Sequence, residues 1–240
     1  MVLDEKYDVI VVGGGHAGCE AAYSAAKMGA NVLMITMNMQ TIGQMSCNPA
    51  MGGVAKGQIV REIDALGGGS ARITDKSMIQ FRMLNRSKGP AMWSPRVQSD
   101  RMLFAQYWRE LLEETPGLNM FQDMVTGLNV SDNTVQGVRT ALGLTFEAQT
   151  VILTSGTFMN GLIHVGDQNF GGGRAGERAR TGITDELVSR GFEGGRMKTG
   201  RTPIRDGRNL AISVMERQPG EGHTGAFRLE GDYARKRQRS

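Results

Sequence analysis

Residues 7–28 read YDVIVVGGGHAGCEAAYSAAKM, and this stretch decides the fold. The β-branched run from Val9 to Val12 predicts a short strand that is buried on both faces. The alanine-rich segment after Gly18 predicts a helix that can pack closely on a sheet. Between them, a G-x-G-x-x-G pattern lets the chain turn tightly and brings backbone N–H groups against a phosphate at the helix N-terminus.

This glycine pattern has the context that makes it informative, a strand before it and a helix after it. It therefore favours dinucleotide binding over the alternative, a glycine-rich turn that holds no ligand. The residues expected to cradle the pyrophosphate are Gly13, Gly14, Gly15, His16, Ala17 and Gly18.

The composition is that of a soluble globular protein. A length of 240 residues allows one large domain or two small ones. No apolar run reaches the length of a membrane span, and the two cysteines make no disulfide framework, so we expect a cytoplasmic protein. The three histidines lack metal-ligand spacing, and no metal site is expected.

The positive charge is concentrated near the end of the sequence. Residues 174–240 hold 15 of the 28 lysines and arginines. Such a basic segment is compatible with an RNA or phosphate partner, and the alternative is a solvated, disordered tail.

The remaining pattern predicts an α/β fold. A second strand over residues 31–36 ends at Thr36, where many dinucleotide-binding folds have an acidic residue for the ribose; its absence weakens a simple NAD interpretation. Helices are expected over residues 58–66, 100–114 (capped by Ser99) and 183–190. Strands are expected over 118–121, 125–130, 135–140, 144–148 and 151–157, the middle three as a β-meander. This order is typical of FAD-binding domains of the glutathione-reductase type, with a Rossmann-like parallel sheet.

Two of these helices have predicted apolar faces. In the first helix, Ile59, Ile63 and Leu66 lie at helical spacing. In the second, the expected face consists of Met102, Leu103, Tyr107, Leu111 and Leu112.

Two loops are candidates for the site. Residues 43–53 are too rich in Gly, Pro and Asn for regular structure, and they hold Cys47 with Lys56 nearby. A thiol beside a cation becomes a nucleophile, so Cys47 is a candidate catalytic residue; the alternative is a small buried cysteine. Residues 88–96 are a second polar loop, expected at the surface of the cofactor cleft.

Several stretches together resemble the family of tRNA uridine 5-carboxymethylaminomethyl modification enzymes, MnmG, also called glucose-inhibited division protein A or GidA. The Ser-Cys-Asn-Pro-Ala segment from Ser46, combined with residues 56–69, is highly specific. The matching stretches are residues 13–22, 43–50, 52–69, 88–91, 157–158 and 172–176.

The resemblance implies a flavoenzyme that uses FAD, with NADH as reductant, to modify C5 of the wobble uridine in tRNA. It also implies a GTPase partner, MnmE, and a homodimer. By matching position, Cys47 is the family's catalytic cysteine, Val125 contacts the adenine side of FAD, and Arg180 stands where the family has a flavin-contacting serine. Two other interpretations remain, a general FAD/NADH-dependent oxidoreductase acting on a small substrate and a non-catalytic fragment that binds flavin or RNA.

The family chain is more than twice as long as this one. We therefore expect an incomplete, truncated FAD-binding domain over residues 1–200. Residues 201–240 are expected to begin an NAD-binding insertion domain or to form a disordered basic tail. The resemblance implies that this chain alone does not complete the reaction.

Overall fold

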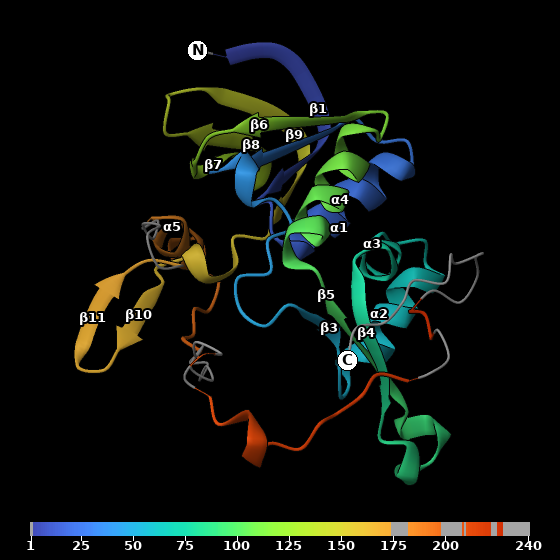
Figure 1. The fold of residues 1–240 in the computed structure, drawn as a ribbon. Coiled ribbons are helices and arrows are strands. Elements are labelled where there is room, and N and C mark those ends of the chain that lie inside the picture. Colours follow the sequence, from blue (N-terminus) through green and yellow to red (C-terminus); the bar gives the residue numbers. More distant parts are fainter. Residues whose placement is uncertain (1, 174–181, 198–207, 209, 222–224, 228–240) are drawn as a thin grey trace.

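A computed structural model describes residues 2–173, 182–197, 208, 210–221 and 225–227 (Figure 1). Its main layer is a six-stranded sheet with the order β6-β2-β1-β9-β8-β7. These strands are β1 (Val2–Val12), β2 (Val32–Thr36), β6 (Leu118–Gln122), β7 (Val125–Ser131), β8 (Thr134–Thr140) and β9 (Thr145–Leu153). The pairs β6-β2, β2-β1 and β1-β9 are parallel, and β7, β8 and β9 pair antiparallel. The mostly parallel α/β sheet with a β-meander is confirmed.

Helices α1 (His16–Lys27) and α4 (Arg101–Glu113) cover one face of this sheet (Figure 1). Alternate residues of the central strand point to opposite sides, as the period of two requires. Val11 packs under α1 and α4, whereas Ile10 and Val12 pack on the other face with β7, β8 and α5 (Ile183–Ser189). The prediction that this strand is buried on both faces is confirmed.

A second, three-stranded antiparallel sheet has the order β3-β5-β4. Its strands are β3 (Ala50–Gly52), β4 (Met78–Leu84) and β5 (Ser94–Ser99), and helices α2 (Lys56–Ala65) and α3 (Ser70–Lys76) accompany it. Phe81 and Val97 form its core together with Phe227, which is fully buried. The Phe227 N–H donates to the Asp75 carboxylate at 2.9 Å, so residues 225–227 return to this layer.

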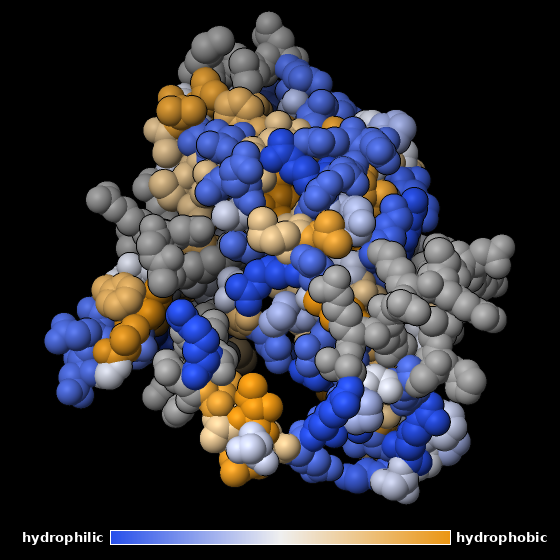
Figure 2. Space-filling model, in the orientation of Figure 1, coloured by the Kyte–Doolittle hydropathy of each residue, from blue (hydrophilic) through white to orange (hydrophobic). Residues whose placement is uncertain are grey.

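The shorter elements lie in the connections between these strands and helices. They are η1 (Met39–Thr41), η2 (Arg86–Lys88), η3 (Pro90–Met92), η4 (Gly156–Phe158), η6 (Ile212–Val214) and the hairpin β10 (Leu162–Val165) and β11 (Gln168–Gly171). Ile212, Val214 and Met215 form an exposed apolar patch over η6, seen at the lower edge of the space-filling view (Figure 2). None of the helices in the described ranges is long and apolar enough to cross a membrane.

Three expectations about strands and loops are wrong. Residues 144–148 and 151–157 are not separate strands: β9 runs unbroken from Thr145 to Leu153, because neither Gln149 nor Thr150 interrupts extended backbone. It pairs with β1 from Thr145 to Leu153, and its first residues, Thr145 to Glu147, also pair with β8. Residues 43–53 contain the short strand β3, and the last three residues of the expected loop 88–96 belong to the strand β5.

The expected details of α4 also need correction. Asp100, not Ser99, caps this helix, since its carboxylate accepts the N–H groups of Met102 and Leu103. A carboxylate one residue later suits the same role because it reaches both amides of the first turn. The buried face consists of Phe104, Trp108 and Leu112, of which only Leu112 was expected. Tyr107 and Leu111 are partly buried against it as expected, whereas Met102 is 77% exposed.

In α2 two of the three residues of the expected apolar face are exposed, and the third, Ile63, is partly buried. Gly57 and Val60 are buried, whereas Ile59 is 53% and Leu66 90% exposed. A Cβ atom at Gly57 would lie 2.5 Å from the Pro95 oxygen, so the helix approaches β5 on its glycine side. Close backbone approach sets the orientation of this helix.

Candidate cofactor site

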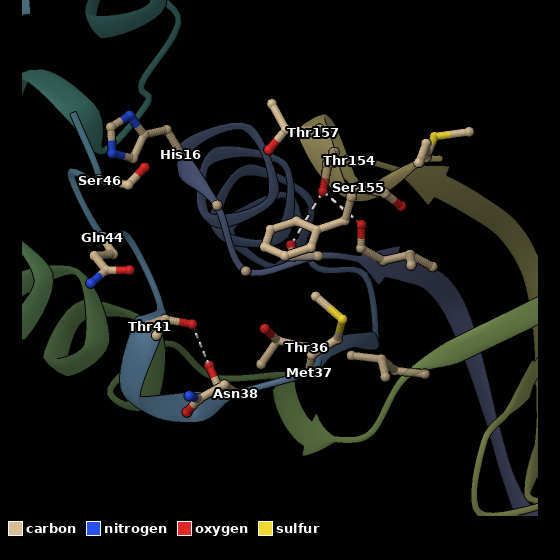
Figure 3. Close-up of a pocket in the computed structure, with 18 of the residues that line it drawn as sticks. His16, Thr36, Met37, Asn38, Thr41, Gln44, Ser46, Thr154, Ser155 and Thr157 are labelled. Atoms are coloured by element: carbon tan, nitrogen blue, oxygen red, sulfur yellow. Dashed lines mark hydrogen bonds between the residues drawn. The ribbon is translucent and has the colours of Figure 1, made fainter. Parts of the chain in front are cut away.

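A cavity of about 440 Å³ opens where β1, β2 and β9 end, at the carboxyl edge of the parallel strands (Figure 3). Ligands of open α/β sheets bind at this edge. The lining comes from stretches that are far apart in the sequence: residues 12–16, 35–38, 41, 44–48, 123–125, 154–159 and 183.

Hydrogen bonds to β2 and to the end of β9 hold the glycine turn in place. Gly13 has a φ of +111°, a conformation that suits glycine, and its N–H donates to the Ile35 oxygen at 2.8 Å. The Thr154 hydroxyl lies 2.8 Å from the Val12 oxygen and 3.2 Å from the Gly13 oxygen (Figure 3). The turn that enters α1 is therefore anchored to both β2 and the end of β9.

The other glycines of the motif have two different spatial roles. A Cβ atom at Gly18 would lie 1.8 Å from the Gly13 oxygen, so only glycine lets α1 approach the turn this closely. At Gly15 an added Cβ would meet no atom of the chain within 4 Å, although this residue lines the cavity. The space above Gly15 is therefore open for a ligand.

The N-terminus of α1 presents an anion-binding surface to this space. The first N–H groups of a helix have no partner within the helix, and the helix dipole adds positive potential there. Within α1, which is described in full, the first turn has no acidic residue and Gly15 at the N-cap makes no side-chain cap bond. Open backbone donors next to open space fit a pyrophosphate.

The cavity lining includes an acidic residue that the sequence pattern did not reveal. At the end of β2, Thr36 is 7% exposed, and the expected absence of an acid on this strand holds. Asp123, after the neighbouring strand β6, lines the cavity instead. Its carboxylate accepts the N–H groups of Met124 at 2.6 Å and Leu142 at 3.2 Å. The available signal was an acid directly after a predicted strand.

Cys47 lines the same cavity and is exposed, so the interpretation as a buried cysteine is wrong. The Cys47 carbonyl oxygen accepts a hydrogen bond from Arg101 Nη2 at 2.8 Å. The next residues are fixed as well, since the Ser99 N–H donates to the Pro49 oxygen at 2.8 Å. The junction of β5 and α4 thus holds the cysteine loop at the cavity.

The two thiols should differ strongly in reactivity. Cys19 is fully buried below Gly14, and burial raises the pKa of its thiol to about 12. We expect a disulfide reagent at pH 8 to react rapidly with one thiol per folded chain, at Cys47, and with two in denaturant. Peptide mapping of the labelled chain identifies the residue, and rapid labelling of Cys19 in the folded state would contradict the burial.

The structure brings together Gly13, Gly14, Gly15, His16, Val125 and Cys47 on one cavity. Ala17 and Gly18 do not line it, and Gly18 acts below the turn. Residues 88–96 are absent from the lining, which corrects their expected place at the cleft. Arg180 lies outside the described residues.

Sequence reasoning identified the small residues after β9 as a strand end but did not assign them to the site. Thr154, Ser155 and Thr157 line the cavity, and Thr154 contacts the glycine turn (Figure 3). Among the residues with described positions, no group of three His, Cys, Asp or Glu side chains could hold a metal ion.

Comparison with known proteins places these features in a family. The profile of the family described as glucose inhibited division protein A matches residues 8–240. A protein of Christiangramia forsetii named tRNA uridine 5-carboxymethylaminomethyl modification enzyme MnmG is 64% identical over 226 residues, which are 94% of this chain. The protein of the same name from Cytophaga hutchinsonii is 64% identical over 92% of the chain. In both cases the chain spans 36% of the relative's length.

A solved structure agrees with the sequence matches. The structure of Aquifex aeolicus GidA is 45% identical, with a TM-score of 0.89 over 93% of this chain and 37% of that one. At this identity and score, the sequence and the fold correspond over almost the whole chain. The chain belongs to the glucose inhibited division protein A family.

Proposed function

We propose that this chain is the FAD-binding, N-terminal part of an enzyme that modifies tRNA, adding a carboxymethylaminomethyl-type group at C5 of the wobble uridine. The observation that carries the proposal is one cavity that joins an open anion-binding turn, residues 13–16, to the exposed Cys47. The names of the two relatives, which describe a tRNA uridine modification enzyme, supply the substrate class.

The cavity fits a dinucleotide such as FAD. Gly13 to His16 would hold the pyrophosphate, with the open space above Gly15 allowing close approach. Val125 and Asp123 would lie on the adenosine side, and Thr154 to Thr157 would bound the cavity next to the glycine turn. When bound, FAD supplies two-electron transfer, which the side chains of this cavity cannot perform themselves.

Cys47 is proposed as the catalytic residue. A thiolate can attack an electrophilic carbon of the uridine ring or of methylene-tetrahydrofolate, the carbon donor that the family resemblance implies, and a thiol can donate a proton there. Arg101 would act as a positioning residue, because it binds the backbone oxygen of Cys47 and leaves the thiol free to point into the cavity.

The other components of the proposal come from the family resemblance. NADH would be the reductant, MnmE the GTPase partner, and the enzyme a cytoplasmic homodimer. The proposed division is an incomplete FAD-binding domain over residues 1–200 and the start of an NAD-binding insertion or a basic tail over residues 201–240. Because the chain spans 36% of its relatives, it is not expected to complete the reaction alone.

The test is the visible spectrum of the purified chain, followed by release and identification of the flavin. We expect FAD near one equivalent per chain, either as purified or after addition of FAD. A chain that takes up no FAD would overturn the cofactor proposal. For a longer protein that contains this chain, tRNA-dependent NADH oxidation supports the RNA substrate, and oxidation driven by a small acceptor alone supports the general oxidoreductase.

A further inference from the structure

The three-stranded sheet has a pair of arginines that nothing in the cofactor site uses. In the antiparallel register of β4 and β5, Arg82 lies directly opposite Arg96, and Gln80 lies opposite Gln98. Residues directly opposite each other in such a pair extend their side chains from the same face. These four residues line a second cavity, of about 310 Å³.

The two arginines have no acidic partner among the described residues. Glu221 does reach this sheet, but its carboxylate binds Arg86 at 2.7 Å and the Met83 N–H at 2.8 Å. Two like charges placed directly opposite destabilise a strand pair. An oxyanion between them removes this repulsion and receives hydrogen bonds from two planar guanidinium groups.

The opposite face of the same strands explains why the arginines point into the cavity. Phe81 and Val97 alternate with them and are buried in the core with Phe227. The period of two then directs Arg82 and Arg96 away from that core. Gln80 is partly engaged, since its amide donates to the Gln218 oxygen at 3.0 Å. Arg82, Arg96 and Gln98 are therefore the donors available in this cavity.

The loop that joins β4 to β5 extends this polar surface. Arg86 and Lys88 are exposed, and Trp93 is 41% exposed with the Arg86 guanidinium 5.9 Å from its ring centre. Hydrophilic side chains dominate the lower right of the space-filling view, where η2 and η3 lie (Figure 2). Cations together with an accessible aromatic ring are the groups that single-stranded RNA binds.

The arginine pair also lies close to the cofactor cavity. Gln98 is paired with Ala50 of β3, and Asn48, two residues before Ala50, lines the cavity that holds Cys47. At the spacing of extended strands this places the two cavities on the order of 10 Å apart. This separation is comparable to one or two nucleotides of an RNA strand.

We propose that Arg82 and Arg96, with Gln98, form a phosphate-binding subsite for an RNA strand whose base reaches the cavity containing Cys47. This assignment rests on the proposed function for its RNA substrate, but the phosphate chemistry follows from the arginine pair. Phosphate contacts of this kind fix the position of a strand and do not read its sequence.

The test measures RNA binding as a function of salt, with a fluorescently labelled tRNA anticodon stem-loop and the full chain. We expect Arg82→Gln and Arg96→Gln each to weaken binding about 10-fold. Each should also lower the slope of log K against log salt concentration by about 0.7, the value for one lost contact to a single strand. Arg72→Gln is the matched control, since Arg72 is exposed on α3, outside the second cavity, and its loss should change binding little.

A second measurement separates the possible sources of the phosphate. Inorganic phosphate is titrated against the chain while the arginine Nε–H signals are followed by NMR. If RNA binding is unchanged in the variants but saturable phosphate shifts are lost in them, the subsite is retained and assigned to a small phosphorylated molecule. If the variants change neither RNA binding nor the phosphate-induced NMR shifts, the proposal is overturned.

The same experiments distinguish failure of this subsite from failure of the proposed function. A chain that takes up FAD and binds RNA equally well with and without the two arginines refutes the RNA subsite alone. A chain that binds no RNA refutes the RNA substrate in the proposed function and the RNA strand at the arginine subsite. The phosphate titration then still decides whether the two arginines bind phosphate. Circular dichroism of both variants is expected to match the parent chain, because each substitution relieves a like-charge pair.

Discussion

Gly15→Val is expected to lower the affinity for FAD by at least about 100-fold, so that no FAD is retained after dialysis, while the chain stays folded. The backbone accepts the new residue, since Gly15 has a φ of −76° and a ψ of −175°, and its Cβ would meet no atom within 4 Å. The valine side chain would instead fill the space between a pyrophosphate and the first N–H groups of α1. Flavin absorbance after dialysis against FAD gives the stoichiometry, and circular dichroism reports the fold.

Gly171→Val is the control for this substitution. It also places a valine where an added Cβ would meet nothing within 4 Å, but at the end of β11, outside the cavity lining. The control should retain one FAD per chain. Stoichiometric flavin in the Gly15→Val chain would show that the cofactor lies elsewhere.

The first βα unit could be predicted because its signals are local. The apolar run, the glycine turn and the alanine-rich helix follow one another within about twenty residues, and each restricts the backbone by itself. The structure confirms the strand, the turn and the helix, and it adds residues 2–8 to the strand. Those added residues are held by pairing with β9, more than 130 positions away, which no local pattern contains.

The three-stranded sheet was missed for a related reason. Its strand β3 has three residues, and β4 and β5 carry arginine and glutamine on their open face. Polar residues at alternate positions look like loop when the partner strand is unknown. The sheet is specified by tertiary pairing and by Phe227, which enters its core from a distant part of the chain.

The candidate site illustrates the same limit at the level of single residues. The sequence indicated the glycine turn and Cys47 separately, from motif and resemblance. Their presence on one cavity depends on the contacts of Cys47 with Arg101 and of Thr154 with the glycine turn, which join segments more than 50 residues apart. Asp123 shows the converse case, since the acid that lines the cavity follows β6 and not β2, where the pattern places it.

Cys47→Ser is expected to leave FAD uptake unchanged and to lower uridine modification by a factor of about 10² to 10⁴. Serine is close to cysteine in shape, and the contacts that position this loop, Arg101 to the Cys47 oxygen and Ser99 to the Pro49 oxygen, involve only its backbone acceptors. The loop geometry therefore remains while the ionisable, nucleophilic thiol is lost.

The measurement of this loss requires a family protein of full length that has this chain as its N-terminal part, with the modified nucleoside quantified by mass spectrometry of digested tRNA. Cys19→Ala is the matched control, because it removes the other thiol at a buried position outside the cavity lining. Its modification activity should stay within a few-fold of the parent protein. Parent-like turnover in Cys47→Ser would remove this thiol from the mechanism, since neither its charge nor its nucleophilicity would then be needed.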